Sequence, residues 1–350
     1  MNEQKIERLI SKNGYLVKWF NPNILNKKII LLAVSSHSRS LQCVNKELCA
    51  DREIVLAAVK NDGCALQYTS AELRADREIV LVAVKNNGRA LEYASDDLRA
   101  DREIVLASVN IDGWSLYYSS ANLRGDREIV LAAVKQNGYS LIFASVNLRA
   151  EREIVLAAVK KNGYSLLFAS AHLCADREIV FTAVKNNGWA LGYAGADLCA
   201  DREIVLTAVK NNPRALSFAS MELYSDREIV LASVNNEGSS LQYAHADLRA
   251  DREIVLAAVK NDGCALQYAS IDLHADHEIV LAAVKNNGYA LRYANAKFYE
   301  DRTIVIYGIK SWKSICTKSV FAELLKIYCC KKSFYYDFSS YLKIKYKSRK

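Results

Sequence analysis

Apolar residues recur along the chain in a 25-residue pattern from residue 51 to residue 300. Each unit opens with a charged triplet, continues with six largely apolar residues, and in most copies has a glycine at its thirteenth position, as in DREIVLAAVKNDG over 51–63. An invariant leucine, an aromatic residue and a second leucine follow, the last replaced once by Phe298. Ten such units run without insertion or deletion. This fixed period predicts a solenoid, in which each unit buries its apolar face against its neighbours.

The first half of each unit predicts a helix. Asp51 is a favourable N-cap, and Lys60 lies near the negative C-terminal end of a helix over about 52–61. Its six consecutive apolar residues lead us to expect cover on nearly every side. A glycine can end a helix with a positive φ, but Pro213 replaces it in the seventh unit. The alternative is a position with negative φ throughout that already begins the next helix.

The second half of each unit fits either a helix or a strand. The alternation Leu-x-Tyr resembles a strand of a leucine-rich repeat, whereas the small residues around it and the lack of an asparagine ladder favour a helix. We expect a helix, with Ser70 and its counterparts starting a final 3₁₀ turn. The predicted fold is therefore all-α, an α-solenoid of about twelve 25-residue helix-turn-helix repeats.

The two ends of the repeat array are less regular. Residues 1–50 contain two degenerate units, expected to cap the open core of the array of ten regular repeats over 51–300. Residues 301–330 begin an eleventh apolar helix and continue into an amphipathic segment, which predicts a C-terminal capping repeat and helix. Residues 331–350 form a tail rich in lysine and tyrosine.

The net charge of +8 belongs to this C-terminal end. Residues 310–350 contain eleven basic and two acidic residues, which leaves 36 basic and 37 acidic residues over 1–309. An electrostatic partner is therefore expected at the tail rather than along the repeats. With no apolar run long enough to span a bilayer, and no apolar secretory signal at the N-terminus, we expect a cytoplasmic protein.

The unit DREIVLAAVKNNGxALxYASxxLRA resembles the repeat of the family known as domain of unknown function 4116. The resemblance covers 51–300 closely, and 26–50 and 301–310 loosely. It implies helical repeats with no assigned enzymatic activity and no catalytic residues to carry over. It also implies an origin among protists, their bacterial associates or large viruses, so the cytosol of a host cell is a second expected location.

No motif in the chain predicts catalysis or a cofactor. The sequence contains no glycine-rich phosphate loop, no nucleophile elbow and no His-Asp-Ser constellation. Its nine cysteines include no CxxC pair, and its five histidines lack the spacing of metal ligands. We therefore expect a protein that is not an enzyme, with no cofactor and no metal.

Two variable positions of the repeat are the candidate binding surface. The residue after the glycine and the residue three further on should share one face of the second element, so that stacking aligns them in a row. One hypothesis is that this row binds a protein partner of unknown identity. The alternative is that its rings pack over the neighbouring turn. We name the following residues the aromatic stripe: Trp114, Tyr117, Tyr139, Ile142, Tyr164, Leu167 and Trp189.

Two further interactions are predicted. Arg and Glu of the opening triplet are expected to pair between consecutive repeats, at about 0–1 kcal/mol for each exposed pair. The tail provides the competing function, contact with nucleic acid or an anionic membrane. We expect the chain to be a monomer. The basic tail residues are Lys331, Lys332, Lys343, Lys345, Lys347, Arg349 and Lys350.

Overall fold

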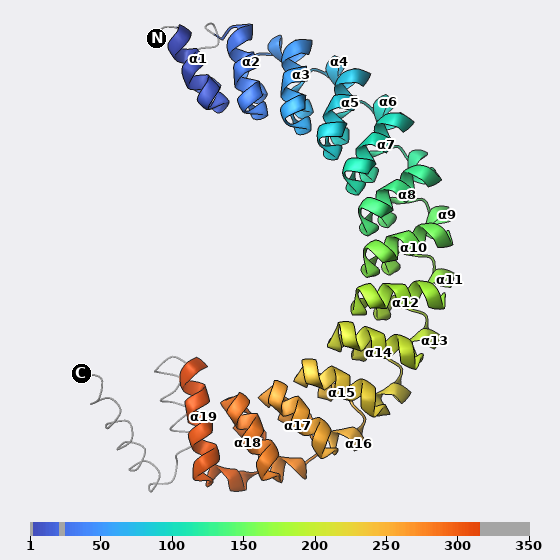
Figure 1. The fold of residues 1–350 in the computed structure, drawn as a ribbon, viewed down its shortest axis with the longest axis vertical. Coiled ribbons are helices and arrows are strands. Elements are labelled where there is room, and N and C mark those ends of the chain that lie inside the picture. The colour runs from blue at the N-terminus through green and yellow to red at the C-terminus, as the bar shows by residue number, and fades with distance from the viewer. Residues whose placement is uncertain (1–2, 21–24, 316–350) are drawn as a thin grey trace, which may run out of the picture. The chain divides into compact units, whose positions relative to one another are not determined.

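The computed structural model describes residues 3–20 and 25–315. Helices are the only regular elements in these residues, which confirms the predicted all-α solenoid. The contacts divide the chain into two compact units, Met1–Leu198 and Cys199–Lys350. Within each unit, the long α-helices stand side by side in chain order (Figure 1).

Each regular repeat contains a ten-residue α-helix, a six-residue 3₁₀ helix and a short third element. In the first unit the long helices are α1 (Glu3–Lys12), α2 (Lys27–Ser36), α3 (Arg52–Asn61), α5 (Arg77–Asn86), α7 (Arg102–Ile111), α8 (Arg127–Gln136), α10 (Arg152–Lys161) and α12 (Arg177–Asn186). In the second unit they are α14 (Arg202–Asn211), α15 (Arg227–Asn236), α17 (Arg252–Asn261), α18 (His277–Asn286) and the longer α19 (Arg302–Ile315).

The second element differs from the expected α-helix, because it is a 3₁₀ helix in every repeat. Its copies are η1 (Gly14–Trp19), η3 (Ser38–Cys43), η5 (Gly63–Tyr68), η6 (Gly88–Tyr93), η7 (Gly113–Tyr118), η9 (Gly138–Phe143), η10 (Gly163–Phe168), η11 (Gly188–Tyr193), η12 (Pro213–Phe218), η14 (Gly238–Tyr243), η15 (Gly263–Tyr268) and η17 (Gly288–Tyr293). With three residues per turn, this element places residues three apart on the same side.

The short third element begins after Ser70 and its counterparts. We expected a 3₁₀ turn there. It is α-helical in α4 (Ala71–Arg74), α6 (Asp96–Arg99), α9 (Val146–Arg149), α11 (Ala171–Cys174), α13 (Ala196–Cys199) and α16 (Ala246–Arg249). It is 3₁₀ in η4 (Leu48–Ala50), η8 (Leu123–Gly125), η13 (Met221–Ser225), η16 (Leu273–Ala275) and η18 (Ala296–Tyr299).

Aspartate caps the long helices as predicted. The Asp51 carboxylate accepts hydrogen bonds from the amides of Glu53 and Ile54 at 3.0 and 3.2 Å. Asp101 and Asp201 accept the same two bonds, and Asp176 and Asp276 accept the bond from the isoleucine amide, whereas Glu151, with one more methylene, makes no such bond to its helix. The cap thus supplies partners for amides that the helix itself leaves unpaired.

The long helix is less enclosed than we predicted. In α3, Ile54, Val55, Ala58 and Val59 are fully buried, but Leu56 and Ala57 are only half-buried. The expectation of cover on nearly every side was therefore wrong. Neighbouring long helices pack on two sides and the 3₁₀ helices on a third, so one side of α3 remains open to solvent.

The conserved glycine of the repeat begins the 3₁₀ helix and has a negative φ, which confirms the second of the two alternatives. No described residue has a positive φ. Glycine is required because a Cβ on Gly63 would lie 2.1 Å from the carbonyl oxygen of Ala83 in the next repeat. Pro213 occupies the first position of η12, where its fixed φ is favourable, and it is half-buried rather than buried.

An asparagine that the sequence analysis overlooked links consecutive repeats. Asn86 accepts a hydrogen bond from the amide of Gly63 at 2.8 Å and donates one to the carbonyl of Lys60 at 2.9 Å. The same bridge joins Asn186 to Gly163 and Lys160, Asn261 to Gly238 and Asn235, and Asn286 to Gly263 and Lys260. We call this side chain the bridging asparagine.

Serine replaces the small alanine of the 3₁₀ helix where the bridging asparagine is missing. Ile111, Gln136 and Lys161 take the place of the asparagine, and the residues four further on are Ser115, Ser140 and Ser165. The buried hydroxyls of these serines lie against Gly88, Gly113 and Gly138 of the preceding repeats. In these three repeats the two positions change together, because both face the glycine of the preceding repeat.

The predicted ion pairs between repeats are present. Arg77 Nε donates to Asp101 Oδ2 at 3.0 Å, and its Nη2 contacts Glu103. The pattern repeats in both units, with Lys27 in place of arginine near the N-terminal end and a contact of His277 with Asp301 near the C-terminal end. These pairs are largely exposed, so they set the register between repeats more than they contribute to the free energy of folding.

Candidate aromatic binding surface

The aromatic stripe lies on the 3₁₀ helices of four consecutive repeats in the first unit. Its two positions are three residues apart and therefore share one side of each 3₁₀ helix. Five of its seven side chains are exposed: Trp114 by 41%, Tyr117 by 57%, Ile142 by 43%, Leu167 by 42% and Trp189 by 38%. For these five, the structure favours an open surface over burial beneath a neighbouring turn.

Tyr139 and Tyr164 lie differently from the rest of the stripe. Both are half-buried, and their ring centroids are 5.9 Å apart. Tyr139 also contacts Phe168, and Tyr164 makes an edge contact with Tyr193 at 5.1 Å. For these two tyrosines, the alternative that the rings pack over the next repeat describes their surroundings better. Tyr139 and Tyr164 therefore pack against rings of the next repeat and contribute less exposed surface than the other members of the stripe.

The hydroxyls of Tyr164 and Tyr193 are joined by a hydrogen bond. Tyr193 Oη donates to Tyr164 Oη at 2.6 Å across the two repeats. This bond, together with partial burial, raises the pKa of Tyr193 to about 12. Tyr193 is therefore neutral near pH 7, and the contact is a polar link within an apolar row.

An open pocket of about 390 Å³ lies at the N-terminal end of the stripe. It is lined by Arg89, Trp114, Tyr117, Tyr118 and Phe143, which come from three consecutive repeats. Trp114 and Tyr117 each lie with their ring centroids 5.2 Å from that of Phe143, at interplanar angles of 62° and 55°. We call Trp114, Tyr117, Tyr118 and Phe143 the aromatic cage.

Charged side chains flank the aromatic cage. Arg89 Nε donates to Asp112 Oδ2 at 3.0 Å, so its charge is paired within the protein. Burial first, and then a hydrogen bond and the charge of Glu92, raise the pKa of Tyr118. Burial and the charge of Glu92 likewise raise the pKa of Tyr93. The Glu92 carboxylate therefore acts on both tyrosines, and Glu92 holds the position of Tyr117 in the preceding repeat.

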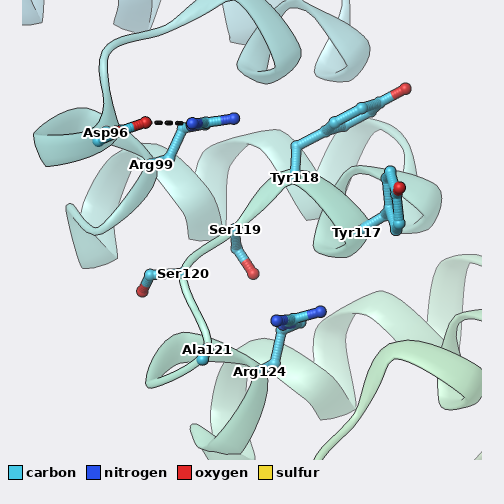
Figure 2. A pocket seen from close by; sticks show the side chains of 8 residues that line it. All are labelled: Asp96, Arg99, Tyr117, Tyr118, Ser119, Ser120, Ala121 and Arg124. Atoms are coloured by element: carbon cyan, nitrogen blue, oxygen red, sulfur yellow. Dashed lines mark hydrogen bonds and ion pairs between the residues drawn. The ribbon is translucent and has the colours of Figure 1, made fainter.

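A second pocket, of about 470 Å³, shares Tyr117 and Tyr118 with the first (Figure 2). The remainder of its lining is polar and includes Asp96, Arg99 and Arg124. Arg99 pairs with Asp96 within α6. Figure 2 shows the guanidinium of Arg124 and the hydroxyl of Ser119 on the same side of the connecting loop. The aromatic pocket reaches the following repeat through Phe143, whereas the polar pocket lies toward the preceding repeat, which supplies Asp96 and Arg99.

The sequence predicts Trp114 and Tyr117 at this site but not its other members. Phe143 and Tyr118 belong to the aromatic position that recurs in every repeat, so comparison of the repeats does not distinguish them from their counterparts. Glu92 occupies the same phase as Tyr117 one repeat earlier, and its charge at that phase was the available signal. Arg89 likewise holds the position equivalent to Trp114 in the preceding repeat.

The remaining sequence predictions concern other parts of the chain. The basic tail residues Lys331 to Lys350 lie outside the described residues, so contact of the tail with nucleic acid or membrane stays a prediction. No disulfide joins the six cysteines that the structure describes. Residues 3–20 and 25–315 contain no cluster of three or more potential metal ligands. Over the same residues, no helix is both long enough and apolar enough to cross a bilayer.

The stacked helical repeats and their exposed row of variable residues place this chain among the α-solenoid repeat proteins. The model of one family matches most of the chain, in seven windows over residues 51–99, 101–149, 151–199, 176–224, 201–249, 226–274 and 251–299. The chain belongs to this family, which is described as Domain of unknown function (DUF4116). Among curated proteins and among solved structures, no match was found.

Proposed function

We propose that this protein is a non-enzymatic scaffold that binds a protein partner through the aromatic stripe. The observation that carries the proposal is the exposure of Trp114, Tyr117, Ile142, Leu167 and Trp189 on consecutive repeats of one unit. Exposed apolar side chains grouped in this way are typical of protein interfaces, in which Trp and Tyr contribute most of the binding energy.

The second unit supports this interpretation, because it builds the same repeat without the stripe. The positions equivalent to Trp114 are Arg214, Ser239 and Cys264 in three of its repeats, and only Tyr289 is aromatic. The fold of a repeat therefore does not require a large ring at this position. The concentration of such rings in the first unit is better explained by a binding role.

The test removes four of the five exposed members of the stripe and leaves Tyr139 and Tyr164 in their ring contacts. The variant combines Trp114→Ser, Tyr117→Ser, Ile142→Ser and Leu167→Ser. The matched control combines Met221→Ser and Ile271→Ser, which remove exposed apolar side chains of the second unit that are 82% and 81% exposed. Partner capture from an extract of cells that make the protein is compared for the wild type and both variants.

We expect the stripe variant to lose captured proteins that the wild type and the control retain, with thermal melting close to that of the wild type. Equal capture by all three proteins would contradict the proposal. If the stripe variant unfolds, the rings belong to the core, and the proposal also fails.

A further inference from the structure

We propose that the aromatic cage binds a basic side chain of the partner, a guanidinium or an ammonium group, with the Glu92 carboxylate as its counter-charge. This inference rests on the proposed function and specifies the chemistry of the partner. The partner segment would be a peptide in which a basic residue is flanked by apolar residues, since apolar members of the stripe continue from the cage into the next repeats.

The geometry of the cage suits a cation. The rings of Trp114, Tyr117 and Phe143 meet at angles of 55° to 62° and so form walls rather than a stack. Tyr117 and Tyr118 are themselves nearly perpendicular, at 73°. Ring faces are electron-rich and attract a cation within about 6 Å of the ring centroid, most strongly for Trp. A pocket of about 390 Å³ can receive a guanidinium and the end of its alkyl chain.

The charges around the cage favour the same ligand. Arg89, the one cation in the wall, is paired with Asp112 and adds little net positive charge. Glu92 is exposed and lies beside the Tyr118 hydroxyl, and no described basic side chain forms an ion pair with it. Glu92 therefore provides an exposed negative charge next to Tyr118, one of the rings of the cage, and a bound guanidinium could make both a cation–π contact and a charge-assisted hydrogen bond.

The second unit shows that the arginine–acid pair alone does not account for the cage. Arg214 Nε donates to Glu237 Oε1 at 2.7 Å, as Arg89 does to Asp112. In that repeat, however, Ser239 and Gln242 stand where Trp114 and Tyr117 stand in the first unit. The ion pair is a feature of the repeat, whereas the rings around it are specific to the site in the first unit.

The test measures the binding of a fluorescein-labelled octapeptide with one arginine between leucines, by fluorescence anisotropy with the full chain. Two further peptides replace the arginine with citrulline, which has the same shape without the charge, or with glutamate. We expect the citrulline peptide to bind roughly tenfold more weakly than the arginine peptide, and the glutamate peptide more weakly still.

Variants of the protein show which residues cause the preference for the arginine peptide. Glu92→Gln and Trp114→Ser should each reduce the preference for arginine over citrulline roughly fivefold or more. Glu72→Gln, a change of another exposed acid in the first unit, should leave the preference unchanged. Thermal melting of each variant shows whether the fold is intact, and Glu92→Gln is not expected to change it because Glu92 is exposed.

The outcomes separate this inference from the proposed function. Equal binding of the arginine and citrulline peptides, or no binding of either, overturns the basic ligand, while the partner-capture experiment still decides whether the stripe binds protein. Preferential binding of the glutamate peptide also overturns it and assigns the site to an acidic ligand at Arg99 and Arg124.

Discussion

The side-chain oxygen of Asn86 accepts a hydrogen bond from the amide of Gly63 in the preceding repeat, at 2.8 Å. The same side chain donates to the carbonyl of Lys60 at 2.9 Å, so a single asparagine pairs two backbone groups where one helix ends and the next begins. Gly63 is buried and cannot take water in exchange. This bridge is therefore a specific connection between repeats, in addition to their apolar packing.

Asn86→Ala should lower the free energy of unfolding by about 1–2 kcal/mol, because it leaves the buried Gly63 amide without a partner. Asn236→Ala is the matched control. Asn236 holds the bridging position in the repeat after Pro213, and Pro213 has no N–H to donate to it. The Asn236 side chain donates instead to the carbonyl of Ala232 in its own helix. Urea denaturation of both variants checks the prediction, and equal effects would show that the bridge contributes nothing specific.

Gly63→Ala should destabilise the protein by about 2 kcal/mol or more, since the added methyl group would lie 2.1 Å from the Ala83 carbonyl oxygen. Gly125→Ala provides the control, because a methyl group there meets only Ser145 atoms, at 3.8 Å and beyond. We expect Gly125→Ala to be neutral or slightly stabilising in thermal melts. A similar loss at both glycines would point to backbone conformation rather than to contact between repeats.

Glu151→Asp should stabilise the protein by about 0.5–1 kcal/mol. Glu151 is the one cap of the regular repeats that is not aspartate, and its side chain makes no bond to the first turn of α10. Aspartate at the equivalent position of α7 accepts bonds from two amides and also pairs with the arginine of the preceding repeat. The midpoint of urea denaturation measures the gain, and an unchanged midpoint would contradict the prediction.

Acid should destabilise the repeats through their aspartate caps. Partial burial alone would raise the pKa of the Asp101 carboxyl, but bonds from the Ile104 amide and Arg77 outweigh it and lower the pKa below its ordinary value of 3.8. The caps Asp126, Asp176, Asp226, Asp251 and Asp276 shift in the same direction.

A carboxyl with a lowered folded-state pKa contributes its stabilisation fully above the unfolded-state pKa and loses it as the pH falls through the folded-state pKa. The free energy of unfolding should therefore be flat above the ordinary pKa of these caps and decline below it. Asp101→Asn, which keeps an N-cap acceptor without the charge, should show a shallower decline. If the variant shows the same pH dependence as the wild type, Asp101 does not contribute to the loss of stability in acid.

Deleting residues 331–350 tests the competing function of the tail. If the tail binds nucleic acid, the full chain should retard RNA or DNA at low salt, and affinity should fall steeply with salt because bound counterions are released. The shortened chain should lose this retardation and keep its helical circular dichroism. Anionic liposomes test the membrane alternative, and absence of binding to all of these at low salt would reject the function.

The sequence by itself determined the architecture. The 25-residue period, the aspartate cap and the apolar run specify a stack of helices, because these patterns depend only on local preferences and on burial that repeats identically in every unit. The ion pairs between Arg77 and the acids of the next repeat followed from the same register. Comparison of repeats also found the exposed members of the aromatic stripe.

The tertiary structure alone decided what each repeated position meets in its neighbour. The identity of the 3₁₀ helix, the contact of Gly63 with Ala83 and the bridge from Asn86 all depend on distances between repeats, which a one-dimensional pattern does not contain. The aromatic cage illustrates the same limit. Its rings come from consecutive repeats and belong partly to the invariant aromatic position, so only stacking brings Phe143 beside Trp114 and Tyr117.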